Sequence, residues 1–138
     1  MMLPLVLLTL AAAPTRASVD ATVRDRFEAV GRSAPEFDPA LTRAATELAA
    51  RALSDGVEDA AGLLRVTSAI SRQAAWEPNP VVIAVRAGND ALVKELAKQD
   101  LGTEPSSHLG VGLAVGAERS AVVVLLAKRR VELSRFTR

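Results

Sequence analysis

The chain has 138 residues, with 17 Lys and Arg against 16 Asp and Glu, a formal net charge of +1 and no cysteine. Such a balance of charge does not favour nucleic acid as a partner, and the lack of cysteine excludes disulfides, thiolate chemistry and a lipid-modified cysteine. Aromatic residues make up 3% of the chain, so we expect an aliphatic core and no ligand site built from stacked aromatic rings.

The N-terminal segment predicts a signal peptide over residues 1–17. Residues 1–13 are apolar but too short to span a bilayer, and a small-residue pattern ending at Ala17 follows Pro14. No Lys or Arg precedes the apolar run, so an uncleaved anchor stays open as the alternative. Cleavage after Ala17 leaves one domain over residues 18–138. Richness in Arg, Ala and Val suggests a bacterial source, so we expect a secreted or periplasmic protein.

Three helices are expected in the first half of the chain. Apolar residues at helical spacing predict a short helix over residues 20–32, and residues 33–37 are expected to be a connector. Asp38, followed by proline, is a typical N-cap and predicts a long helix that ends at residues 54–56. A third helix is expected from Glu58 to Ala75.

A strand and a helix are expected next. The proline-rich segment 76–80 predicts a loop, and the β-branched run Val81 to Val85 predicts a strand buried on both faces. Asn89 and Asp90 are expected to cap a helix that runs through Lys98.

The last third predicts a β-hairpin. Apolar residues alternate with small ones over residues 109–115, which is the period of a strand, and a turn over residues 116–119 follows. The apolar run 120–127 is expected to be the central strand, and residues 131–133 continue it or form a short edge. This element order predicts an α+β fold, with a small mixed or antiparallel sheet flanked by helices.

Two segments resemble the CAP superfamily of cysteine-rich secretory, antigen 5 and pathogenesis-related 1 proteins. Residues 37–49, FDPALTRAATELA, are similar to the first long helix of that family, and residues 108–115, HLGVGLAV, are similar to its Gly-Val-Gly strand. The resemblance implies an α-β-α sandwich and export from the cell.

The same resemblance does not imply the family's cleft, which two histidines and two acidic residues usually line. Its first histidine is expected near residues 54–56 and its second near residues 89–91, and neither segment contains one. The chain is therefore expected to be a divergent member with a degenerate cleft, and no functional residue carries over.

Few residues suggest catalysis or metal binding. His108 is the one histidine, and with Glu104, Ser106 and Ser107 only as sequence neighbours we interpret it as a solvated or capping residue. Adjacent residues of an extended chain point to opposite sides, so Ser107 and His108 are not expected to face each other. We expect no metal and no cofactor.

Acidic and glycine residues also have structural interpretations. Glu47 lies within helical reach of Arg43 and Arg51 and predicts an exposed salt-bridge ladder, while Glu58–Asp59 is the only acidic pair close in sequence. The glycines at 110, 112 and 116 predict a closely packed strand rather than a dinucleotide loop.

Binding residues are expected in a loop and at the C-terminus. Trp76 is either a contact plate for a protein or glycan or, in the interpretation we favour, a plug at the end of the core. Residues 128–138 hold five basic residues and one acidic residue, and Arg129 and Arg130 suit an anionic lipid or cell-wall polymer. Protection of a sheet edge by charge explains them equally well.

The sequence therefore predicts an exported, non-enzymatic CAP-like envelope module with a binding or structural role. The expected partners are a cell-wall polymer, an anionic lipid or an envelope protein, and the oligomeric state stays open. The alternative is a cryptic hydrolase that uses acidic residues of the central helices.

Overall fold

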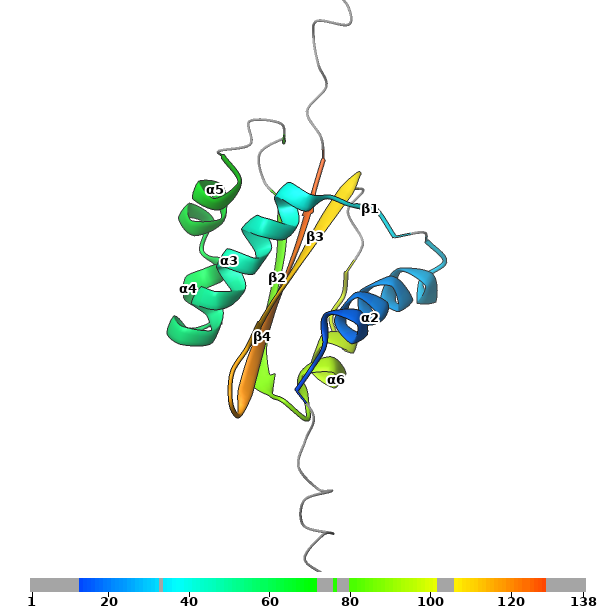
Figure 1. The fold of residues 1–138 in the computed structure, drawn as a ribbon. Coiled ribbons are helices and arrows are strands. Elements are labelled where there is room, and N and C mark those ends of the chain that lie inside the picture. Colours follow the sequence, from blue (N-terminus) through cyan, green and yellow to red (C-terminus); the bar gives the residue numbers. More distant parts are fainter. Residues whose placement is uncertain (1–12, 33, 72–75, 77–79, 102–105, 129–138) are drawn as a thin grey trace, which may run out of the picture.

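A computed structural model describes residues 13–32, 34–71, 76, 80–101 and 106–128 (Figure 1). The elements in chain order are α2 (Arg16–Ala29), β1 (Glu36–Phe37), α3 (Pro39–Asp55), α4 (Val57–Ala61), α5 (Leu63–Ser71), β2 (Val81–Gly88), α6 (Leu92–Ala97), β3 (His108–Val115) and β4 (Arg119–Ala127). The sheet lies between α3, α4 and α5 on one face and α2 and α6 on the other. This is the predicted α+β fold of the sandwich type. No helix within these ranges is long and apolar enough to cross a membrane.

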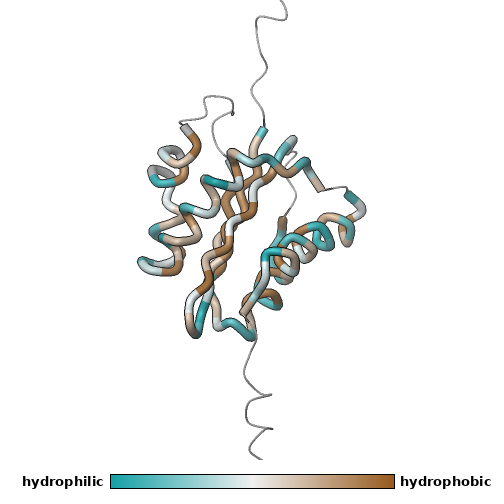
Figure 2. The backbone as a smooth tube through the Cα atoms, in the orientation of Figure 1, coloured by the Kyte–Doolittle hydropathy of each residue, from teal (hydrophilic) through white to brown (hydrophobic). Residues whose placement is uncertain are grey.

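The sheet is mixed, with strand order β1-β3-β4-β2. β1 runs parallel to β3, and the other neighbours are antiparallel. The predicted central position of residues 120–127 is confirmed, because β4 lies between β3 and β2. Side chains of β4 alternate between two apolar clusters, with Ala121, Val123, Leu125 and Ala127 toward α3 and Val122, Val124 and Leu126 toward α2 and α6. Figure 2 shows the hydrophobic residues concentrated in these inner strands.

α3 packs against β3 through the glycines of that strand. A Cβ atom at Gly110 would overlap the backbone of Leu41, and one at Gly112 would overlap the backbone of Ala45. Close approach of two backbones is the usual reason for glycine inside a strand. The interpretation of the glycines at 110 and 112 as a closely packed strand is therefore confirmed.

The two ends of α3 lie where the sequence predicts them. The Asp38 carboxylate accepts a hydrogen bond from the backbone N–H of Leu41 at 2.9 Å, and Pro39 occupies the first helical position. Gly56 ends the helix with φ of 113°, a backbone conformation that favours glycine. The Arg86 side chain donates to the terminal carbonyls of Ala52 and Leu53 at 3.4 and 3.2 Å.

Two predictions about the connections of α3 are wrong. Residues 33–37 are not only a connector, because Glu36 and Phe37 form β1 and pair with His108 and Leu109 of β3. The helix expected from Glu58 to Ala75 is broken at Gly62, whose extended conformation (φ −60°, ψ 141°) separates α4 from α5. Residues 72–75 lie outside the described part of the chain.

The predictions around β2 also need correction. The strand reaches Gly88 and is an edge strand, so its residues are mostly half-buried rather than buried on both faces. Asn89 and Asp90 do not cap α6, whose N-cap is Ala91 without a side-chain hydrogen bond.

Asn89 instead fixes the β3–β4 hairpin to the end of β2. Its Nδ2 donates to the carbonyls of Gly116 and Ala117 at 3.1 and 3.3 Å, and its Oδ1 accepts from the Ser120 hydroxyl at 2.6 Å. These partners lie about thirty residues away along the chain, so no local capping pattern reveals them.

α2 begins at Arg16, two residues before the expected first mature residue. The Thr15 hydroxyl accepts from the backbone N–H of Ser18 at 3.1 Å, and the Ser18 hydroxyl in turn accepts from the Thr15 N–H at 3.2 Å. This reciprocal pair is a capping box. Cleavage after Ala17 would remove the cap.

Thr15→Ala in the full chain is expected to lower the free energy of unfolding by about 1 kcal/mol, because one orphan helix donor loses its acceptor. Urea denaturation measures the change. Thr46→Ala is the matched control, since Thr46 is exposed in the middle of α3 and its hydroxyl bonds only to the preceding turn. Equal losses in both variants would contradict the cap.

Candidate functional site

His108 lies at the start of β3, where side chains from three segments meet. Its Nδ1 is 2.8 Å from the Ser107 hydroxyl oxygen, and its Nε2 is 3.9 Å from Oε2 of Glu36 on β1. The Trp76 ring lies edge-on to the imidazole, with ring centroids 5.4 Å apart. The His108 side chain is 15% exposed and that of Glu36 is 80% exposed.

The expectation that Ser107 and His108 point apart is therefore wrong. Ser107 precedes β3 in a bend, so the strict alternation of an extended chain does not yet apply to it. The sequence also missed Glu36 as a neighbour, because only the parallel pairing of β1 with β3 places Glu36 opposite His108.

The hydrogen bonds of Ser107 favour a structural role over a nucleophilic one. Its hydroxyl donates to the backbone carbonyl of Ala127 at 3.4 Å, and its backbone N–H donates to the same oxygen at 3.1 Å. Which atom donates in the 2.8 Å contact between the Ser107 hydroxyl and His108 Nδ1 depends on the imidazole tautomer, so this contact does not identify a catalytic base. The two hydrogen bonds from Ser107 to Ala127 connect the start of β3 to the end of β4.

Trp76 lies in the core cluster on the α3 side of the sheet and is 5% exposed. The indole therefore fills space at the end of the core, and a contact plate would require it to leave that position. Substitution of Trp76 by alanine is expected to destabilise the fold, so loss of binding in that variant would not identify a contact.

Several predicted residues fall outside the described part of the chain. Arg129 and Arg130 of the basic segment do so, as do Glu104 and residues 131–133. Lys128, the first residue of the basic segment, is exposed at the end of β4. These residues stay candidates on sequence grounds.

The acidic residues of the central helices do not form a buried pair. The predicted ladder is wrong, because within the described residues neither Arg43 nor Arg51 forms an ion pair with Glu47. Glu47, Glu58 and Asp59 are all exposed, and Asp59 pairs with Arg65 at 3.7 Å. Among the residues that the structure describes, no three His, Asp or Glu side chains are grouped to hold a metal ion.

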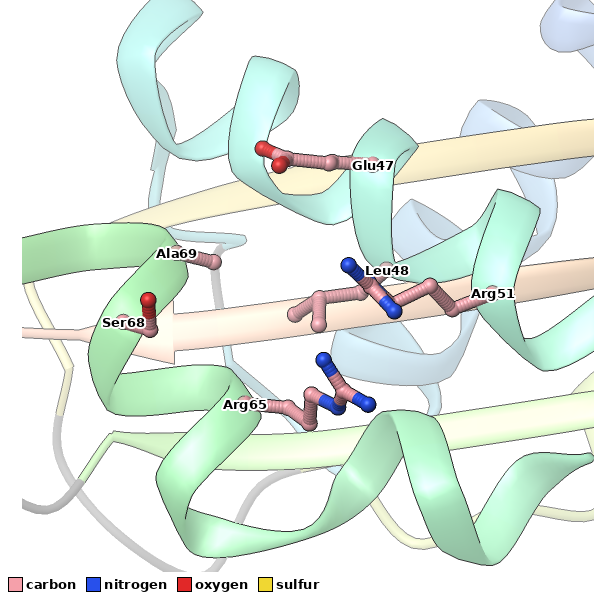
Figure 3. Close-up of a pocket in the computed structure, with 6 residues that line it drawn as sticks. All are labelled: Glu47, Leu48, Arg51, Arg65, Ser68 and Ala69. Atoms are coloured by element: carbon pink, nitrogen blue, oxygen red, sulfur yellow. The ribbon is translucent and has the colours of Figure 1, made fainter. Parts of the chain in front are cut away.

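A small pocket of about 90 Å³ lies between α3 and α5 (Figure 3). Its lining residues are Glu47, Leu48 and Arg51 of α3 and Arg65, Ser68 and Ala69 of α5. In Figure 3 the Arg51 and Arg65 guanidinium groups face each other across the space between the helices. We call this site the paired-arginine pocket. No local sequence signal brings its two arginines together, because helix packing places them.

The two segments in which the resemblance to the CAP superfamily leads us to expect histidines contain other residues, with structural roles. Residues 54–56 end α3, and Asn89 binds the hairpin.

Comparison of the chain with family models, curated proteins and solved structures gives no match.

Proposed function

We propose that this protein is an exported, non-enzymatic envelope module with a CAP-like fold, which binds or supports another component of the cell envelope. The observation that carries the proposal is the direct packing of α3 on β3. These two elements contain the segments that resemble the CAP superfamily, and they are about sixty residues apart in the sequence.

The close packing of α3 on β3 depends on two glycines of the strand. Gly110 and Gly112 are the residues of the Gly-Val-Gly pattern, and both lie against the backbone of α3 at Leu41 and Ala45. The contact with α3 therefore explains why glycine occupies these two positions, whereas the sequence alone shows only a common strand motif. The resemblance to the CAP superfamily implies a helix-sheet-helix sandwich, and this packing of α3 on the sheet is consistent with that expectation.

A binding or structural role is preferred over hydrolysis because the acidic side chains of the central helices are dispersed. Glu47 lies on α3, and Glu58 and Asp59 lie on α4, each exposed to solvent. General acid and base catalysis needs groups that converge on one reacting bond. We expect the basic segment 128–138, with Arg129 and Arg130, to bind an anionic wall polymer, lipid or envelope protein by electrostatic attraction.

Fractionation of a bacterium that expresses the full chain tests the proposal. We expect the protein in the periplasm, with an intact mass that corresponds to a chain beginning at Ser18. This mature protein is expected to sediment with the envelope at low salt and to leave it near 0.15 M salt, where charges more than about 8 Å apart are screened.

The variant that tests the basic segment carries the double substitution Arg129→Gln and Arg130→Gln. It is expected to weaken sedimentation and to leave the melting temperature unchanged. Recovery of the uncleaved chain from the cytosol alone would reject export. Sedimentation that responds to neither salt nor the double substitution would reject binding through the basic segment.

A further inference from the structure

The paired-arginine pocket brings two positive charges together without an equal negative charge between them. Arg51 projects from α3 and Arg65 from α5, and in Figure 3 the Arg51 guanidinium lies between the Glu47 carboxylate and the Arg65 guanidinium. The lining thus holds two cations and one carboxylate, a net charge of +1. Two facing guanidinium groups repel each other unless an anion lies between them.

The side chains of the protein leave the hydrogen-bonding capacity of these arginines largely unused. Arg51 makes no side-chain hydrogen bond or ion pair to any residue that the structure describes. Arg65 forms one ion pair, to Asp59 at 3.7 Å, in which both side chains are at least 40% exposed. An exposed ion pair of this kind contributes little and is easily exchanged for a better acceptor.

The size and lining of the pocket suit a small anion. Its volume is about 90 Å³ and it is partly open to solvent, so a single carboxylate or phosphate group fits this space. Leu48 and Ala69 give the pocket an apolar part, which lowers the local polarity and strengthens charge-assisted hydrogen bonds.

We propose that the paired-arginine pocket is a binding site for one oxyanion group, a carboxylate or a phosphate, that bridges Arg51 and Arg65. Each guanidinium presents planar, paired donors that match the oxygens of such a group. This inference adds a site to the proposed envelope module and does not depend on export or on the basic segment.

Titration of the purified, folded protein by two-dimensional amide NMR tests the site. Sodium acetate and sodium phosphate are added separately, with sodium chloride used to hold the ionic strength constant. We expect saturable shifts at residues of α3 and α5 around the pocket, with a dissociation constant on the order of 1–10 mM, because a single small group contributes limited binding energy. The comparison of the two anions shows which oxyanion the pocket prefers.

Arg51→Gln and Arg65→Gln are each expected to weaken binding about tenfold, since each removes one set of charge-assisted hydrogen bonds. Arg43→Gln is the matched control, because Arg43 is an exposed arginine of α3 that does not line the pocket. Its affinity should equal that of the unmodified protein. Chloride shifts as large as those of both anions, or equal affinity in all three variants, would overturn the proposal, whatever the outcome of the fractionation experiment.

Discussion

Val123→Asp is expected to unfold the domain. Val123 is fully buried in β4, the central strand, where it pairs with Gly112 of β3 and Ala84 of β2. Its side chain points into the apolar cluster beneath α3, so an aspartate there would lose its hydration without an ionic partner. The cost is about 4 kcal/mol or more, a large part of the 5–15 kcal/mol that stabilises a typical domain.

Circular dichroism and urea denaturation measure this loss. Val115→Asp is the matched control, because Val115 lies at the exposed end of β3 and is 50% exposed. The free energy of unfolding of the control should change by only about 0.5 kcal/mol. A cooperative transition of Val123→Asp at the same urea concentration as the control would show that the centre of the sheet is not buried as described.

The elements that the sequence predicts well are those whose signals are local. The start of α3 depends on Asp38 and Pro39, and its end on Gly56, so all the required information lies within the helix itself. The hairpin of β3 and β4 is equally local, because alternation and a short turn bring its strands together. The central place of β4 follows from its continuous apolar run, which only a strand covered on both faces accommodates.

The errors arise where distant segments decide the local structure. Glu36 forms a strand because β3 offers a free edge, although the segment is too short to predict one. Asn89 has the sequence of a helix cap, but the carbonyls at Gly116 and Ala117 bind its side chain instead. Gly62 breaks a continuous helical pattern between α4 and α5, and the glycine was the only local sign of it.

The candidate sites are harder to predict than the fold, because side chains that meet there come from separate elements. Arg51 and Arg65 each have the appearance of a solvated helix residue, and only the packing of α5 beside α3 makes them face each other. The sequence predicts His108 as a solvated or capping residue, yet its side chain is 15% exposed, because the parallel pairing of β1 and the position of Trp76 supply its surroundings. Sequence therefore points to several of these residues one at a time and misses Glu36 and Arg65, which only strand pairing and helix packing bring to the two groups.

Gly112→Ala is expected to lower the free energy of unfolding by about 3 kcal/mol, which corresponds to a fall of roughly 10 °C in melting temperature. The added methyl group would overlap the carbonyl group of Ala45 and the backbone nitrogen of Thr46, and none of these atoms belongs to a flexible side chain. α3 would have to move away from β3 as a unit. Such a movement would loosen the contacts of Leu41 and Leu48 with the sheet.

Gly62→Ala is the matched control for this substitution. A Cβ atom at Gly62 would lie 3.4 Å from the nearest atom, the Asp59 carbonyl oxygen, and the φ of −60° suits alanine. Its stability should therefore stay within about 1 kcal/mol of that of the unmodified protein. If Gly112→Ala proved as harmless as the control, the backbones of α3 and β3 would not be in contact, and the proposed CAP-like fold would lose the packing that supports it.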